Sequence, residues 1–239
     1  MKPAVVVVLV VLLALVPTAN AQTADTTSFG SKNTFSAVIE YANDSSHIIL
    51  GRASNRKFTA LGIQYERRLL SNRFLTLRYA AEFRPLIFVR DTTEIEAFTI
   101  ADGPITASVT EPPIAVTQCV PQTEVLLITT IQITCSHRWT YAQGLSPFGA
   151  RMNLRPNRRL QPTASLLAGY ILSSQKTPID AAGSFNFSFE IGAGLEYFLS
   201  PKHSMRFEYQ FQHFSNAYTA LQNPGVDSGL FKLSYTFGR

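Results

Sequence analysis

The chain has 239 residues, of which 46% are hydrophobic and 15% are charged. That length suits one domain or at most two, and the apolar content excludes a mostly disordered chain. The formal net charge is +5, but the basic residues are scattered along the sequence rather than gathered in one stripe. The charge therefore fits an anionic lipid surface at least as well as a nucleic acid, and we expect no nucleic-acid partner.

Residues 1–21 have the pattern of a secretory signal peptide. A basic start at Lys2 precedes an apolar run over 4–16 that is too short to span a bilayer as a helix. The small residues 19–21 form a cleavage site, so we expect cleavage after Ala21; an uncleaved anchor is the alternative. No later segment is an apolar helix of spanning length. If the mature chain enters a membrane, it must do so as a closed barrel.

The dominant signal after the leader is a two-residue alternation of apolar and polar side chains, which is the period of a β-strand. From Phe185 to Tyr197, for example, odd positions are apolar or aromatic and even positions are Asn, Ser, Glu or Gly. Such alternation predicts about eight strands, near residues 33–42, 57–69, 73–90, 137–154, 160–174, 184–199, 203–216 and 228–237. Residues 22–239 are therefore expected to form one β-barrel domain.

The polar faces of these strands carry charges of both signs. They include Glu40, Glu66, Arg78, Glu82, Arg84, Glu190, Glu196, Arg206, Glu208 and Lys232. A transmembrane barrel turns its apolar residues outward and its polar residues into the lumen, where opposite charges can pair. Together with export, this predicts an all-β fold, an eight-stranded antiparallel transmembrane β-barrel of the Gram-negative cell outer membrane.

The connections alternate in length, as short periplasmic turns and long external loops do. Turns are expected at 70–72, 155–159 and 200–202, and a long polar loop is expected over about 91–136. Pro147 interrupts the alternation of its strand and predicts a bulge there. Cys119 and Cys135 are expected to form a disulfide in the long loop, the alternative being two free thiols. With no histidine pair nearby they do not suggest a zinc site, and no metal or other cofactor is expected.

A candidate nucleophile and base lie at the end of the seventh predicted strand. His213 and Ser215 are two residues apart, so their side chains share one face of a strand. His213 could take the proton that makes the Ser215 hydroxyl a nucleophile, and Asp227 could orient the imidazole. On strand parity all three side chains face outward, toward lipid and near the external rim. On spacing alone, however, the plainer interpretation is favoured: a polar strand end entering a turn.

The loop between these strands offers further candidates. Asn216 and Asn223 carry amide donors suited to an oxyanion, and Pro224-Gly225 bends the chain so that Asp227 can return to His213.

The run His-Phe-Ser-Asn-Ala at 213–217, followed by Asn-Pro-Gly-Val-Asp at 223–227, resembles the lipid A 3-O-deacylases, a family of acyloxyacyl hydrolases. The resemblance is best over about 137–237. It implies an eight-stranded barrel that hydrolyses the ester-linked acyl chain at the 3-position of lipid A without a metal. The resemblance also implies His213 as the base, Ser215 as the nucleophile and Asn223 as an oxyanion donor, with Asn216 as a supporting candidate. Two positions depart from the family: Asp227 replaces a glutamate, and Tyr218 stands where glycine is common.

Three functions are compatible with this pattern. The first is a lipid A deacylase acting on lipopolysaccharide, the second a non-catalytic barrel such as an adhesin or structural protein, and the third a soluble secreted barrel with an apolar ligand inside. The sequence is compatible with a homodimer but does not decide the oligomeric state. Basic residues near the external loops are candidate ligands of lipid phosphates, the alternative being solvated loop charges. These are Arg52, Arg56, Lys57, Arg90 and Arg138.

Overall fold

The computed structural model describes residues 29–42, 49–53, 55–100, 106–111, 120–127 and 129–238. The predicted signal peptide lies outside these residues. The described chain forms one ten-stranded antiparallel sheet. Its strands are β1 Asn33–Ala42, β2 Lys57–Ser71, β3 Leu75–Ile100, β4 Thr106–Glu111, β5 Gln122–Leu126, β6 Thr129–Leu154, β7 Leu160–Ser173, β8 Phe185–Ser200, β9 His203–Ser215 and β10 Val226–Gly238.

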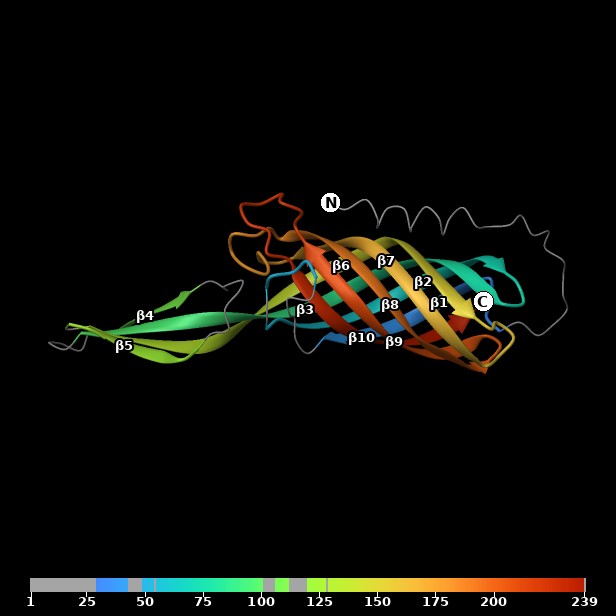
Figure 1. The fold of residues 1–239 in the computed structure, drawn as a ribbon, viewed down its shortest axis with the longest axis horizontal. Coiled ribbons are helices and arrows are strands. Elements are labelled where there is room, and N and C mark those ends of the chain that lie inside the picture. Colours follow the sequence, from blue (N-terminus) through green and yellow to red (C-terminus); the bar gives the residue numbers. More distant parts are fainter. Residues whose placement is uncertain are drawn as a thin grey trace.

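Eight of these strands close into a ring (Figure 1). The order is β3-β2-β1-β10-β9-β8-β7-β6, and an antiparallel pairing of β3 with β6 completes the circle. The predicted eight-stranded barrel is confirmed. Six of the predicted strands agree with the observed bounds to within two residues, because their alternation is uninterrupted.

The prediction of a long polar loop over 91–136 is wrong. Beyond the barrel β3 and β6 remain paired as far as Ile100 and Thr129, and β4 and β5 add to their outer edges. The result is a β-arm that extends away from the ring (Figure 1). The arm segments of β3 and β6 are rich in threonine and isoleucine, whose branched side chains suit strands even where the sequence is polar. Cys135 lies in this arm and is disulfide-bonded. Cys119 lies outside the described residues, so its pairing stays a prediction.

The predicted bulge at Pro147 is confirmed. Between Leu145 and Phe148 the register of β6 against β7 shifts, so that one extra residue of β6 is accommodated next to the proline. Proline cannot donate to the ladder, which explains why the strand bulges at this position.

The wall of the barrel has an apolar outside and a polar inside. Ile39, Ile63, Phe207 and Leu233 are each about half exposed, at 53%, 54%, 53% and 44%. Their neighbours in sequence face inward and, apart from the partly exposed Gly62, are buried. This is the inverted arrangement of a transmembrane barrel, so the alternative of a soluble barrel around an apolar ligand is wrong. Among the described residues, no helix is long and apolar enough to cross a membrane.

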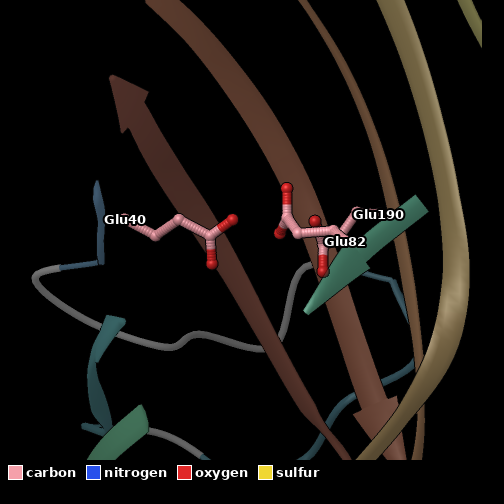
Figure 2. Close-up of side chains that lie close together, drawn as sticks. All are labelled: Glu40, Glu82 and Glu190. Atoms are coloured by element: carbon pink, nitrogen blue, oxygen red, sulfur yellow. The ribbon is translucent and has the colours of Figure 1, made fainter. Parts of the chain in front are cut away.

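Ion pairs fill the middle of the lumen, as the mixed signs on the polar faces predict. Glu40, Glu82 and Glu190 converge from three different strands (Figure 2). Lys232 Nζ lies 2.8 Å from Glu40 and 2.6 Å from Glu82, and Arg84 bridges to all three carboxylates. The ammonium and guanidinium thus supply, from within the chain, the positive charge that such a cluster needs. A second layer, toward the tight turns, pairs three arginines with three glutamates: Arg78, Arg151, Arg206, Glu66, Glu196 and Glu208.

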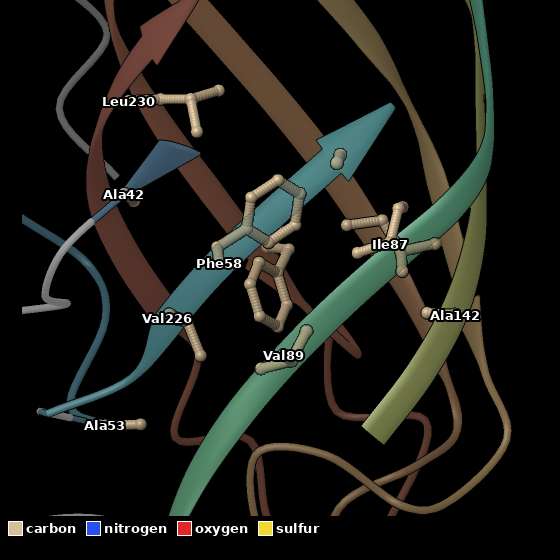
Figure 3. Packing of buried hydrophobic residues seen from close by; sticks show 11 residues of the cluster. Ala42, Ala53, Phe58, Ile87, Val89, Ala142, Val226 and Leu230 are labelled. Atoms are coloured by element: carbon tan, nitrogen blue, oxygen red, sulfur yellow. The ribbon is translucent and has the colours of Figure 1, made fainter. Parts of the chain in front are cut away.

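An apolar cluster fills the lumen at the end of the barrel that carries the long connections. The sequence analysis does not predict this cluster. Phe58, Ile87 and Val89 pack with Val226 and Leu230 inside the ring (Figure 3). The cluster also includes Phe214, 1% exposed, which lies between His213 and Ser215 in the sequence. The outer end of β9 is therefore packed from inside, which fixes the backbone that carries the candidate site.

Candidate active site

The structure brings His213, Ser215 and Asp227 together at the ends of two neighbouring strands. His213 on β9 and Asp227 on β10 are direct cross-strand partners. His213 Nδ1 lies 2.6 Å from Asp227 Oδ1, and His213 Nε2 lies 3.1 Å from Ser215 Oγ. With the imidazole proton on Nδ1, the ring donates to the aspartate and accepts from the serine hydroxyl. Both distances are within hydrogen-bond range, as the predicted roles of nucleophile, base and orienting acid require.

These three side chains project from the outside of the barrel. Gln212 and Phe214 are buried in the lumen, whereas His213 and Ser215 are half-buried on the opposite face. Asp227 has the parity of Phe231, which is 47% exposed on the outer wall. The placement agrees with the parity of the strands in the sequence. The Ser215 hydroxyl is therefore accessible to a molecule that lies against the outer wall, and not to one inside the lumen.

Asp227 is fully buried although it lies on the outer face, because residues 49–53 cross over it. The backbone amides of Ile49 and Leu50 donate to Asp227 Oδ2 at 2.7 and 2.8 Å. Farther along, the amide of Arg52 donates to the Pro224 carbonyl at 2.6 Å. We call residues 49–53 the strap. It saturates one carboxylate oxygen and leaves the other aimed at the imidazole, a role that sequence reasoning missed.

Two glycines make this close packing possible. A Cβ at Gly51 would lie 2.5 Å from the Asp227 amide nitrogen and 2.8 Å from the Val226 carbonyl carbon. Gly225 has a φ of +62°, and a Cβ there would lie 3.0 Å from His213 Cε1. Glycine at 51 was the signal in the sequence that another segment approaches the backbone here.

We expect Gly51→Ala to lower the kcat of ester hydrolysis at Ser215 by about tenfold or more. The added Cβ would displace the strap and so remove the amide donors that hold Asp227 in place. The barrel should remain inserted and heat-modifiable, since the strap contributes no strand to the ring. Gly183→Ala is the matched control, because a Cβ there meets nothing closer than 3.5 Å. Equal activity of both variants would show that the strap does not position the acid.

The loop between β9 and β10 is tied together by its asparagines. The Asn216 side chain donates to the Gln222 carbonyl at 2.7 Å and accepts from the Tyr218 amide at 2.9 Å. Asn223 Oδ1 accepts from the Asn216 amide at 3.0 Å. Asn223 Nδ2 makes no hydrogen bond to any described residue, whereas the Asn216 amide group is already used. The geometry therefore favours Asn223 over Asn216 as a donor to an oxyanion beside Ser215.

The departure from the family at Tyr218 has a backbone counterpart. Ala217 and Tyr218 both have positive φ, at 51° and 63°, a region that glycine occupies without cost. Tyr218 is 79% exposed, so its ring packs little against the rest of the loop.

The basic residues expected to meet lipid phosphates fall into two groups. Arg56 is 1% exposed, and its Nε lies 2.9 Å from the buried Asp91 carboxylate, so the expectation for Arg56 is wrong. Arg138 also faces inward and bridges Asp91 and Asp180, at 3.6 and 3.0 Å. Both arginines tie the barrel mouth to the loop between β7 and β8. Arg52, Lys57 and Arg90 remain on the outside of the barrel.

Comparison with known proteins agrees with the motif. The family model described as lipid A 3-O-deacylase (PagL) matches residues 128–236. The resemblance to the lipid A 3-O-deacylase family is confirmed. The PagL match spans β6 to β10 and includes every residue of the candidate active site except those of the strap. No curated protein matches the sequence.

Solved outer-membrane structures are similar at low identity. The outer membrane enzyme PagL is 13% identical, with 86% of this chain and 99% of that chain covered and a TM-score of 0.46. Neisserial surface protein A is 13% identical, with 87% and 98% covered and a TM-score of 0.45. The attachment invasion locus protein Ail of Yersinia pestis is 10% identical, with 87% and 99% covered and a TM-score of 0.38.

Proposed function

We propose that the protein is a lipid A 3-O-deacylase of the outer membrane, a serine esterase that hydrolyses the ester-linked acyl chain at the 3-position of lipid A. The observation that carries the proposal is the contact chain from Asp227 through His213 to Ser215 on the outside of a transmembrane barrel. The PagL family match over 128–236 supports the same substrate.

In the first half of the reaction, Ser215 Oγ attacks the ester carbonyl while its proton moves to His213 Nε2. The carbonyl oxygen becomes an oxyanion, and we assign its stabilisation to the Asn223 Nδ2 amide. Asp227 accepts from Nδ1–H and stabilises the imidazolium. When the tetrahedral intermediate collapses, the bond between the carbonyl carbon and the sugar oxygen breaks. His213 gives its proton to that oxygen, which leaves as the 3-hydroxyl of the sugar. The acyl group stays on Ser215.

The second half returns the enzyme to its starting state. Water attacks the acyl-serine carbonyl and loses its proton to His213 Nε2, and collapse releases the fatty acid and restores the Ser215 hydroxyl. No group other than water is consumed.

The outward position of the site suits a membrane lipid. The wall around His213 and Ser215 is apolar, with Phe187 and Phe189 of the neighbouring β8 exposed at 49% and 40%. An acyl chain lying along this wall would bring its ester to the level of Ser215 without leaving the bilayer. A water-soluble substrate would gain nothing from this placement.

Mass spectrometry of lipid A tests the proposal directly. Cells expressing the protein should accumulate lipid A that has lost one acyl chain from the 3-position, and cells with an empty vector should not. Unchanged lipid A, with the barrel present and heat-modifiable in the outer membrane, would favour the non-catalytic alternative.

The family departure at Asp227 leads to a specific expectation. The shorter carboxylate already reaches His213 at 2.6 Å, because the two residues are direct cross-strand partners. Asp227→Glu must fit an extra methylene beneath the strap, so we expect activity to fall rather than rise. Asp227→Asn should lose more, about 10³-fold or beyond, because an amide can donate to Nδ1 and so favours the wrong tautomer. Release of fatty acid from purified lipid A measures both, and a glutamate variant faster than wild type would contradict the expectation.

A further inference from the structure

Three basic side chains on the outer wall have no counter-charge in the described structure. Arg52, Lys57 and Arg90 form no ion pair with any described residue, whereas Arg56 and Arg138 on the inner side are paired with aspartates. The two groups differ in the direction in which their side chains point, outward or into the barrel.

Lys57 and Arg90 are placed directly opposite each other on neighbouring strands. They are register partners across β2 and β3, and both are half-buried on the outward face. Like charges directly opposite in a sheet repel and destabilise the pairing. An anion bound between them would turn this repulsion into attraction.

The surroundings of this pair are those of a lipid headgroup region. Trp139 is the register partner of Arg90 on β6 and is 57% exposed, and tryptophan concentrates at the level of membrane headgroups. Toward the middle of the barrel the outward positions are apolar, including Leu86, Phe88 and Leu61 at 39%, 42% and 44% exposed. The pair therefore lies where an acyl-covered wall meets the layer of lipid phosphates.

The pair lies at the same end of the barrel as the candidate active site. Toward that end, Lys57 lies one residue beyond Phe58, the last partner of β1 on β2, and Asp227 lies four residues beyond Phe231, the last partner of β1 on β10. In the ring β9 and β2 are three strand positions apart, or roughly 14 Å along the wall at about 4.8 Å per strand. Arg52 lies between them, exposed on the strap.

We propose that Lys57 and Arg90 bind a phosphate group of the lipid A headgroup, with Arg52 as an additional contact nearer to the scissile ester. The inference rests on the proposed function for the identity of the lipid. A disaccharide headgroup with phosphates at its two ends extends along the wall in the direction from Arg90 to Ser215. The guanidinium of Arg90 suits a bidentate contact with phosphate, and the ammonium of Lys57 adds a point charge.

Trp139 provides a built-in probe, because it is the only tryptophan in the sequence and the cross-strand neighbour of Arg90. Detergent-solubilised protein with Ser215→Ala is titrated with bisphosphorylated lipid A, with lipid A stripped of phosphate, and with inorganic phosphate, while Trp139 emission is recorded. Bisphosphorylated lipid A should bind at least about tenfold more tightly than the stripped lipid, and Lys57→Gln/Arg90→Gln should abolish that preference. Inorganic phosphate should compete only weakly.

The matched control is Arg158→Gln/Arg159→Gln, which removes the same charge from two exposed residues at the opposite end of the barrel. This variant should keep the preference for phosphate. Equal affinity of the wild type for both lipids, or equal loss in both double variants, would overturn the proposal. If phosphorylated lipid A binds through Lys57 and Arg90 but the protein with Ser215 intact releases no fatty acid, the headgroup site stands and the deacylase proposal fails.

Discussion

Ser215→Ala is expected to reduce lipid A deacylation by at least about 10³-fold while leaving an inserted, heat-modifiable barrel. The reason is chemical: without the hydroxyl no acyl-enzyme can form, and His213 has no proton to take from position 215. The fold should be unaffected, because one half-buried hydroxyl on the outer wall at the end of β9 contributes nothing to the lumen or to the ring.

Release of the acyl chain in isolated outer membranes measures the effect. Ser188→Ala is the matched control, since Ser188 lies on the neighbouring strand opposite Phe214 but points into the lumen. The control should keep full activity. Full activity of Ser215→Ala would remove this serine as the nucleophile and, with it, the mechanism proposed above.

The eight barrel strands could be predicted because a transmembrane wall imposes alternation on every residue. One face contacts lipid and the other contacts a polar lumen, so a slip of one residue would reverse both. The same regularity places His213, Ser215 and Asp227 on one face from parity alone. The register that makes His213 and Asp227 direct partners was not predicted, because the last strand was expected over 228–237 and in the structure begins at Val226.

The features that could not be predicted depend on contacts between distant segments. The strap reaches Asp227 from a position more than 170 residues earlier in the chain, and a single glycine was its signature. Arg56 and Lys57 are adjacent in sequence, yet one ends inside against Asp91 and the other outside. Alternation continued from β2 gives Arg56 the inward parity of Phe58, but its partner Asp91 lies on β3 and could not be identified from the sequence.

The β-arm escaped prediction for a different reason. Its strands contact water rather than lipid, so apolar and polar residues alternate only weakly along them. Threonine also occupies many of the positions where valine or isoleucine would have indicated a strand.

Arg84→Met is expected to give the largest loss of stability among single substitutions in the barrel. Arg84 is fully buried and contacts Glu40, Glu82 and Glu190, as well as the Ser146 hydroxyl at 2.7 Å. Without its guanidinium, three carboxylates would share the single ammonium of Lys232. Removing one partner from a buried charge network costs about 3–5 kcal/mol, because the remaining charges stay desolvated without compensation.

The temperature at which heat-modifiable gel mobility is lost measures this destabilisation. A second variant, Arg84→Met/Glu190→Gln, removes one positive and one negative charge together and should recover part of the loss. If the cost came only from the lost volume of the arginine, the two variants would unfold alike, and the electrostatic account of the lumen would fail. Deacylation per folded molecule should change little in either variant, because Arg84 acts on the lumen side of the wall and the Ser215 site lies on the other.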